Sequence, residues 1–224
     1  MGICIAIDGP AGAGKSTAAR LLAEKLGFIY MDTGAMYRAI GVHADDAGIP
    51  MDDPQMIARA CEDVDITLSY EGGVQHLFLN GNDLTDRLRT EEAGRLASAV
   101  SKIGEVRARL VDLQRKLAGT ENVVMDGRDI GTVVMPNADL KVFLTASVPV
   151  RARRRFLELQ QKGVQCDFDD VIRDIEERDY NDTHRAASPL VMAPDAMLID
   201  SSDMTFDEVV ACIIQALKEK TGAL

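Results

Sequence analysis

The chain has 224 residues, of which 46% are hydrophobic and 27% charged, and its formal net charge is −11. This composition is ordinary for a globular protein, and the length suits one α/β domain with small inserted modules. The acidic balance argues against a nucleic-acid-binding protein, because such affinity comes mainly from basic side chains that neutralise phosphates.

A glycine-rich loop is the first feature in chain order. The apolar run 3–7 predicts a buried strand, residues 9–16 spell GPAGAGKS, and the segment 16–26 has apolar residues at helical spacing. A G-x-x-x-x-G-K-[ST] loop between a strand and a helix is typical of phosphate binding. Its amides and the helix N-terminus attract a polyphosphate, Lys15 reaches the outer phosphates, and the Ser16 hydroxyl can ligate Mg²⁺. The sequence therefore predicts that the chain binds a nucleoside triphosphate.

The second predicted strand, residues 28–31, leads into DTGAMYR at residues 32–38. Ligands of parallel sheets bind at the carboxyl ends of the strands, and here a hydroxyl, an aromatic ring and an arginine follow the strand together. This favours a second ligand site at 32–38. The alternative is an ordinary turn and helix start in which Thr33 is the N-cap.

Residues 63–86 interrupt the alternation of strands and helices. Apolar and polar residues alternate from Val64 to Leu68, EGG at 71–73 predicts a turn, and 74–79 returns, which together predict an antiparallel hairpin. An arginine-rich segment at 151–166 predicts a second insertion, a short helical lid. Two insertions near a nucleotide loop indicate flaps that close over substrates.

The strand predicted at 123–125 ends in DGRD, residues 126–129, after an amphipathic helix over 106–117. Asp126 resembles the carboxylate that supports Mg²⁺ in phosphate-loop enzymes. Arg128 can bind a phosphate with two hydrogen bonds, and Asp129 can accept hydrogen bonds from an exocyclic amine. The alternative is a charged turn with an internal Arg–Asp pair.

Arginines recur in the last third of the chain. Arg151 to Arg155 follow the strand predicted at 140–144, near the carboxyl edge of the sheet. Arg178, Asp182 and Arg185 have the spacing of one helix face, which fits either a phosphate and a sugar hydroxyl or a surface ion-pair ladder. The chain closes with a strand at 196–199 and a helix that opens on a capping box at 205–208.

These elements predict an α/β fold in three layers, a central five-stranded parallel sheet flanked by helices, in the manner of P-loop proteins. We expect a single domain over 1–224, with its core at 1–62, 87–150 and 167–224, the hairpin insertion at about 63–86 on the acceptor side, and the lid at about 151–166.

Assembled, the motifs are similar to those of the bacterial cytidylate kinases, members of the nucleoside monophosphate kinase family. The resemblance runs nearly end to end and rests on residues 8–17, 32–38, 126–134 and 177–179, continuing to Arg185 and the Pro-Leu pair at 189–190. The 63–86 hairpin is similar to the insertion that distinguishes bacterial CMP kinases. The resemblance implies transfer of the ATP γ-phosphoryl group to CMP and dCMP, with Mg²⁺.

The resemblance also implies roles for individual residues. Catalysis is expected of Lys15, Arg128 and Arg178, and Mg²⁺ binding of Ser16 and Asp126. Ser98, Arg107 and Asp129 are expected to recognise the cytosine edge. The first two lie in no compact motif. ATP is expected to contact Gly9, Pro10, Ala11, Gly12, Ala13, Gly14, Lys15, Ser16, Thr17, Arg151 and Arg154; the CMP phosphate Thr33, Tyr37, Arg38, Arg128 and Arg178; and the ribose side Asp182, Arg178 and Arg185.

Two other classes of function stay open. One is a different small-molecule P-loop kinase, and the other a nucleotide-bound regulatory protein without turnover. A GTP-binding switch would need an N-K-x-D motif, which this sequence lacks. We expect a monomer that binds small nucleotides and neither nucleic acid nor membranes. The scattered cysteines, the lack of a long apolar run and the lack of a signal-peptide pattern predict a cytoplasmic location.

Overall fold

The computed structural model describes residues 2–71, 74–119 and 121–222. The chain forms two compact units, the first made of Met1–Ile29 and Glu121–Leu224 and the second of Tyr30–Thr120. We call them the first and the second unit and describe each by itself. No helix among the described residues is long and apolar enough to cross a membrane.

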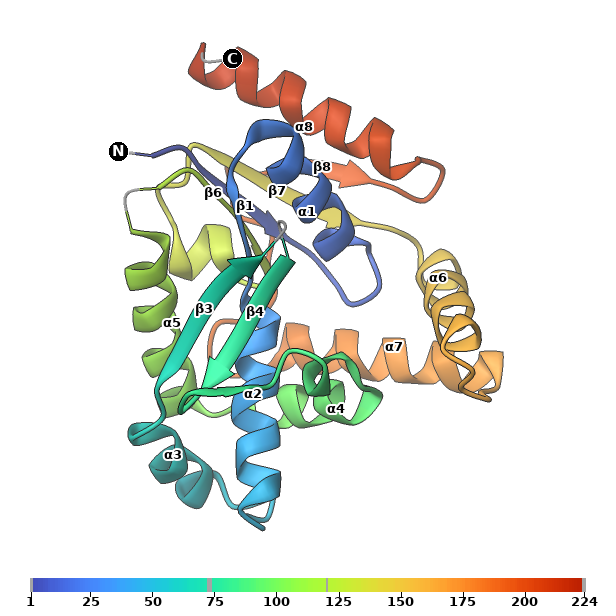
Figure 1. Ribbon diagram of the computed structural model, residues 1–224. Coiled ribbons are helices and arrows are strands. Elements are labelled where there is room, and N and C mark those ends of the chain that lie inside the picture. Colours follow the sequence, from blue (N-terminus) through green and yellow to red (C-terminus); the bar gives the residue numbers. More distant parts are fainter. Residues whose placement is uncertain (1, 72–73, 120, 223–224) are drawn as a thin grey trace. The chain divides into compact units, whose positions relative to one another are not determined.

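A five-stranded sheet organises the first unit (Figure 1). Its strand order is β2-β6-β1-β7-β8, and β1 pairs in parallel with both β6 and β7, as β7 does with β8. The central strands are almost wholly buried, as expected for a parallel sheet covered on both faces. This confirms the predicted sheet, whose strands are β1 (Cys4–Asp8), β2 (Ile29–Asp32), β6 (Val123–Gly127), β7 (Leu140–Thr145) and β8 (Met197–Asp200).

The chain leaves the first unit after Ile29 and returns to it at Glu121, just before β6. β2 begins in the first unit at Ile29, whose amide donates to the carbonyl of Asn122 at 2.9 Å. Asn122 directly precedes β6, the neighbour of β2 in the sheet. The two ends of the long segment between them are therefore one hydrogen bond apart.

Helices cover the sheet of the first unit. Helix α8 (Phe206–Thr221) packs beside α1 (Lys15–Leu26), and it opens on the predicted capping box of Thr205 and Glu208. Helix α6 (Val148–Gln161) packs on α7 (Phe168–His184) through buried residues such as Leu159 and Ile175. The helix predicted at 151–166 therefore begins earlier and ends earlier, because Pro149 sits in its first turn and Gly163 adopts a left-handed conformation after its end.

The second unit is a helical cluster with a small sheet. Its apolar core includes Met36, Ile40, Leu77 and Leu110. The antiparallel sheet has the order β3-β4-β5, so the predicted hairpin gains a short third strand, while the turn predicted at 71–73 lies partly outside the described residues. The elements are α2 (Thr33–Asp46), α3 (Pro54–Glu62), β3 (Ile66–Glu71), β4 (Val74–Leu79), β5 (Asn82–Asp83), the 3₁₀ turn η1 (Arg87–Arg89), α4 (Glu91–Val100) and α5 (Gly104–Ala118).

The start of α2 corrects one alternative. The N-cap is Asp32, whose side chain accepts a hydrogen bond from the amide of Ala35 at 3.0 Å. Thr33 is already the first helical residue, so the interpretation of Thr33 as a mere cap is wrong. Asp32 takes the capping position because it is the last residue of β2 and directly precedes the first helical residue.

Candidate active site

The loop of residues 9–16, called the phosphate loop below, joins β1 to α1. Gly9 has φ of 149°, and a Cβ there would lie 2.0 Å from the carbonyl oxygen of Leu144. Gly14 is the N-cap of α1 in a left-handed conformation, with the Phe206 ring 2.5 Å from the place of a Cβ. Because glycine offers no capping side chain, the first amides of α1 are directed at whatever anion the loop encloses.

Lys15 lies inside the phosphate loop. Its Nζ donates to the carbonyl of Pro10 at 2.8 Å, and the residue is buried. Burial, helped by the charge of Arg128, lowers the pKa of Lys15. An ammonium group held this way is well prepared for a polyphosphate, whose negative charge would stabilise its protonated form.

Ser16 and Asp126 lie together, as the prediction of a Mg²⁺ site requires. The Ser16 hydroxyl donates to Oδ2 of Asp126 at 2.9 Å. Asp126 stands opposite Ile7 in the register of β6 and β1, which brings it beside the loop. Mg²⁺ is usually bound by one or two protein oxygens together with phosphates and water, so this pair fits the ion.

Arg151 supports the phosphate loop from α6. Its Nη1 donates to the carbonyl of Ala11 at 2.9 Å, and its guanidinium pairs with both oxygens of Asp179 at 3.1 and 2.6 Å. The side chain is almost fully buried. The structure thus places Arg151 against the backbone of the loop, and a direct contact with ATP stays a prediction.

Arg154 has a similar position one turn later. Its Nη1 donates to the carbonyl of Ala13 at 3.3 Å and its Nη2 to the carbonyl of Ser201 at 2.6 Å. The guanidinium lies 5.6 Å from the centre of the Phe206 ring. Both arginines, which were expected on a lid, therefore donate hydrogen bonds to backbone carbonyls of the phosphate loop.

The segment 126–129 is joined to α7 by ion pairs. Nε of Arg128 lies 2.7 Å from Oδ2 of Asp182, and Arg185 lies 3.8 Å from both Asp182 and Asp129. Burial acts to raise the pKa of Asp182, but the guanidinium of Arg128 holds it below its usual value. Arg128 and Asp129 thus have ion-pair partners outside their own turn, whereas the alternative was a charged turn with an internal Arg–Asp pair.

The predicted stripe on α7 needs one correction. Arg178 and Asp182 lie on the helix, and Nη2 of Arg178 is 3.0 Å from Oδ2 of Asp174. Arg185 follows the helix as its C-cap, with ψ of 141°, because α7 ends at His184. It does not continue the helix face, although it still approaches Asp182.

In the second unit, the start of α2 carries Thr33, Tyr37 and Arg38. Nη2 of Arg38 binds Oδ2 of Asp32 at 2.6 Å, and a Cβ at Gly34 would lie 3.2 Å from Nη1 of Arg38. The amide of Asp32 donates to Oε1 of Gln75 on β4 at 2.9 Å, which ties the hairpin to this helix start.

The connection of α4 to α5 brings the other predicted residues of the second unit together. The guanidinium of Arg107 lies 5.4 Å from the centre of the Tyr37 ring, and its Nη1 donates to the carbonyl of Ser101 at 3.2 Å. The Ser101 hydroxyl in turn donates to the carbonyl of Ser98 at 3.1 Å. Arg107 is buried, so its orientation is set by these contacts.

Four supporting residues were given no role in the sequence prediction, although the first, second and last lie in its motifs: Asp8, Asp32, Gln75 and Asp179. Asp8 is buried at the end of β1 and accepts hydrogen bonds from the amides of Ile130 and Gly131. Burial raises the pKa of Asp8 to about 6. The available signal was position, since Asp8 and Asp32 each close a strand, as Asp126 nearly does.

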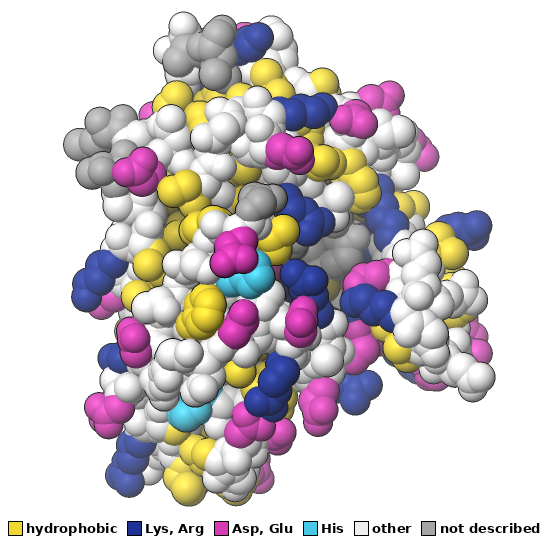
Figure 2. Space-filling model, viewed as in Figure 1, with side chains coloured by type: hydrophobic (Ala, Val, Ile, Leu, Met, Phe, Trp, Pro, Cys, Tyr) yellow, Lys and Arg dark blue, Asp and Glu magenta, His cyan; other side chains and the backbone are white. Residues whose placement is uncertain are grey.

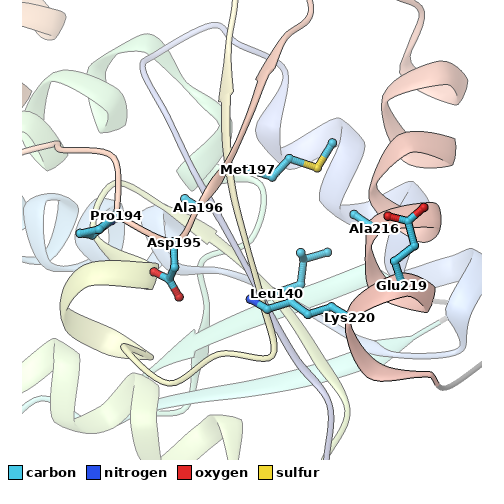
Figure 3. A pocket seen from close by; sticks show the side chains of 8 residues that line it. All are labelled: Leu140, Pro194, Asp195, Ala196, Met197, Ala216, Glu219 and Lys220. Atoms are coloured by element: carbon cyan, nitrogen blue, oxygen red, sulfur yellow. The ribbon is translucent and has the colours of Figure 1, made fainter.

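A surface depression of the first unit lies away from the phosphate loop (Figure 3). It faces the start of β7 and the segment before β8, whereas the loop follows the carboxyl end of β1. Ligands of open parallel sheets bind at carboxyl ends, so the depression does not belong to the candidate site. It is lined by Leu140, Pro194, Asp195, Ala196, Met197, Ala216, Glu219 and Lys220.

One face of the surface is mixed in charge. On the face drawn in Figure 2, Lys and Arg side chains lie next to Asp and Glu side chains rather than in one basic band. That distribution agrees with the net charge of −11.

Comparisons with known proteins name a family. The profile of the family described as cytidylate kinase matches residues 5–219. The cytidylate kinase of Lactobacillus johnsonii is 47% identical over 216 residues, which cover 96% of this chain and 94% of that protein. Those of Caldicellulosiruptor bescii and Carboxydothermus hydrogenoformans are 49% and 48% identical, covering 95% and 98% of this chain and 94% and 99% of theirs.

A solved structure supports the fold alone. An uncharacterized protein from Eubacterium ventriosum superposes with a TM-score of 0.55 over 98% of this chain and 99% of its own, at 14% sequence identity. The match of sequence across nearly the whole chain is the stronger finding, and it agrees with the motifs and with the geometry around the phosphate loop. The chain belongs to the cytidylate kinase family.

Proposed function

We propose that the protein transfers the γ-phosphoryl group of ATP to CMP and dCMP, which gives ADP and CDP or dCDP. One observation carries the proposal: the Ser16 hydroxyl of the phosphate loop donates to Asp126 at 2.9 Å, which joins the loop to the segment that carries Arg128, and the charge of Arg128 acts on the pKa of Lys15. A lysine suited to the donor phosphates and an arginine suited to an acceptor phosphate therefore share one site.

The donor half consists of the phosphate loop and its supports. The loop amides and Lys15 bind the phosphates of ATP, while Arg151 and Arg154 hold the backbone of the loop in shape. Ser16 and Asp126 would hold Mg²⁺. When bound, the ion supplies neutralisation of charge on the phosphate oxygens.

The acceptor half needs no strong general base. The second pKa of a phosphomonoester is about 6, so the attacking oxygen is already anionic near neutral pH. Catalysis then comes from positioning and from charge stabilisation by Arg128 and Arg178. Thr33, Tyr37 and Arg38 of the second unit complete the binding of the CMP phosphate.

Recognition of the base is assigned to Asp129, with Ser98 and Arg107. Cytosine presents an exocyclic amine that a carboxylate can accept from, whereas uracil presents a carbonyl at that edge. Two acceptors facing each other in a buried site cost about 1–3 kcal/mol, which predicts a strong preference for CMP over UMP. Asp182 and Arg185 are assigned to the ribose side.

The protein is further proposed to work as a monomer on small nucleotides, as one kinase domain. The hairpin at 63–86 and the segment at 151–166 would close over the substrates. Closure excludes water, which would otherwise accept the phosphoryl group from ATP.

The test is the formation of ADP from ATP and Mg²⁺ with CMP, dCMP, UMP, AMP and GMP in parallel. We expect strong activity with CMP and dCMP, little with UMP, and none without an acceptor. Turnover of another acceptor alone would indicate a different small-molecule kinase. ATP binding without turnover of any acceptor would indicate a regulatory nucleotide-binding protein.

A further inference from the structure

Asp8 closes β1 and makes contacts that the proposed mechanism does not use. Its Oδ1 accepts a hydrogen bond from the amide of Ile130 at 2.8 Å, and its Oδ2 accepts one from the amide of Gly131 at 2.7 Å. The carboxylate is buried. Two short bonds from one buried carboxylate to consecutive amides form a well-defined anchor for the backbone.

These two amides open the π-helical turn Ile130–Val134, whose N-cap residue is Asp129. An Asp at the N-cap ordinarily accepts a hydrogen bond from its own turn. Within the described turn, the side chain of Asp129 makes no such capping bond. One carboxylate oxygen of Asp129 lies instead 3.8 Å from Nη2 of Arg185. Asp8, more than a hundred residues away in sequence, caps the turn in its place.

The surroundings of Asp8 fit this arrangement closely. A Cβ at Gly131 would lie 3.3 Å from Oδ2 of Asp8 and 3.1 Å from Cδ of Lys141, so glycine lets the carboxylate approach. Burial, and to a smaller degree the charge of Asp129, raises the pKa of Asp8, while the two hydrogen bonds from the amides of Ile130 and Gly131 act to lower it.

We propose that Asp8 is a positioning residue for base recognition: it caps the 130–134 turn so that Asp129 can present its carboxylate to the base of the acceptor. The inference deepens the proposed function and rests on it, because it takes Asp129 as the group that distinguishes cytosine from uracil. Without Asp8, the amides of Ile130 and Gly131 compete for the Asp129 carboxylate, which then turns toward its own backbone.

The decisive variant is Asp8→Asn, which keeps the shape of the side chain but replaces one acceptor with an amide that cannot accept. We would measure kcat/KM for CMP and for UMP in the wild type, Asp8→Asn, Asp129→Asn and the double variant. The expected result is at least a fivefold fall in the CMP-to-UMP ratio for Asp8→Asn. In the Asp129→Asn background the same substitution should change that ratio less than twofold, because coupled residues are non-additive.

Two outcomes would overturn the proposal. One is an unchanged ratio in a folded Asp8→Asn protein, and the other is a fall of equal size in the presence and absence of the Asp129 carboxylate. The matched control is Asp139→Asn, since Oδ2 of Asp139 accepts from the amide of Cys4 at 2.8 Å near the opposite end of β1. It removes a similar bond, and we expect it to leave the ratio unchanged.

A second variant covers loss of folding in Asp8→Asn, which thermal unfolding would detect. Gly131→Ala crowds the same carboxylate oxygen from the other side, and we expect it to lower the CMP-to-UMP ratio in the same direction. An unchanged ratio in a folded Gly131→Ala protein would count against the proposal.

Amide hydrogen exchange separates this inference from the proposed function. If the wild type showed no preference for CMP, the proposed function would fail, but capping could still be measured without substrate. We expect the amides of Ile130 and Gly131 to exchange faster in Asp8→Asn, and faster again when Asp8→Asn is combined with Asp129→Ala, because alanine has no side-chain acceptor that could take over the cap. Unaltered exchange in Asp8→Asn would show that Asp8 does not cap the turn.

Discussion

The phosphate loop of the first unit and the start of α2 in the second hold their site residues in different ways. At the phosphate loop, Lys15, Arg151 and Arg154 all donate to carbonyls of the loop. At the start of α2, side chains contact side chains, with Arg38 on Asp32 and Arg107 over the Tyr37 ring. Backbone contacts fix a loop before a ligand arrives, whereas contacts between side chains can be exchanged for contacts with a ligand.

The difference matches the two substrates that we assign. A triphosphate is shared by many enzymes and can be met by a rigid loop, since its charge and shape do not vary. A nucleoside monophosphate must be distinguished from close relatives, which favours contacts that form only with the right one. Variants at the phosphate loop should therefore alter the binding of ATP, and variants at the start of α2 should alter the binding of CMP.

The largest expected effect is at Gly9. In Gly9→Ala the new Cβ would lie 2.0 Å from the carbonyl oxygen of Leu144, at a φ of 149° that L residues rarely adopt. We expect a loss of about 3 kcal/mol or more in unfolding free energy, and loss of ATP binding. Denaturant unfolding and ATP titration would measure both. The control is Gly104→Ala, because no described atom lies within 4 Å of a Cβ there; equal stability of the two variants would contradict backbone support.

The pH dependence of stability tests the burial of Asp8. Its pKa rises from 3.8 to about 6 on folding, so the folded protein binds more protons than the unfolded chain between about pH 4 and pH 6. Unfolding free energy contributed by Asp8 is therefore full below about pH 4 and is lost as the pH rises through about 6, by up to about 3 kcal/mol. Urea unfolding across this range should show the stability of the wild type falling relative to that of Asp8→Asn as the pH rises, and a constant difference between the two would contradict the raised pKa.

Arg128 tests charge stabilisation in the first unit. Arg128→Ala should lower kcat with CMP at least tenfold, about 1.4 kcal/mol in activation free energy, because it removes a guanidinium from the acceptor phosphate. Steady-state kinetics of ADP formation would measure it, with circular dichroism as the check on folding. Arg153→Ala is the control, since Arg153 is exposed on α6. Normal CMP kinetics in Arg128→Ala would remove it from the site.

The smallest expected effect is at Gly34. A Cβ there would lie 3.1 Å from Oδ1 of Asp32 and 3.2 Å from Nη1 of Arg38, both at the ends of flexible side chains. In Gly34→Ala we expect unfolding free energy unchanged or up to about 1 kcal/mol higher, because alanine favours a helix. The KM for CMP should rise about twofold to tenfold through displacement of Arg38, with the KM for ATP unaltered. A fall in stability as large as that of Gly9→Ala would mean that both units rely on rigid packing.

How much of the site could be predicted from the sequence also differs between the two units. The phosphate loop and the 126–129 segment were predictable because each is a compact motif at the end of an apolar strand, and the five strands were placed to within a residue or two. Ser98 and Arg107 came only from the family resemblance, because helix packing, and no local pattern, brings Arg107 to Tyr37.

The remaining misses have physical causes as well. Asp8 and Asp179 act on groups more than twenty residues away, which strand register and helix packing bring close. The end of α7 at His184 could not be read from the spacing that placed Arg185 on its face, since no glycine or proline follows directly. The strand β5 has only two residues and leaves no periodic signal.

The hydrogen bond between Ile29 and Asn122 has a consequence for how such a protein can change over generations. A segment whose two ends meet inside a sheet is a cassette: it can be lengthened, trimmed or exchanged while the strands on either side keep their register. Residues 30–120 have this arrangement, and they carry Thr33, Tyr37, Arg38, Ser98 and Arg107. The part of acceptor binding that we assign to these residues can therefore vary within one insert, while the phosphate loop and its strands are inherited unchanged.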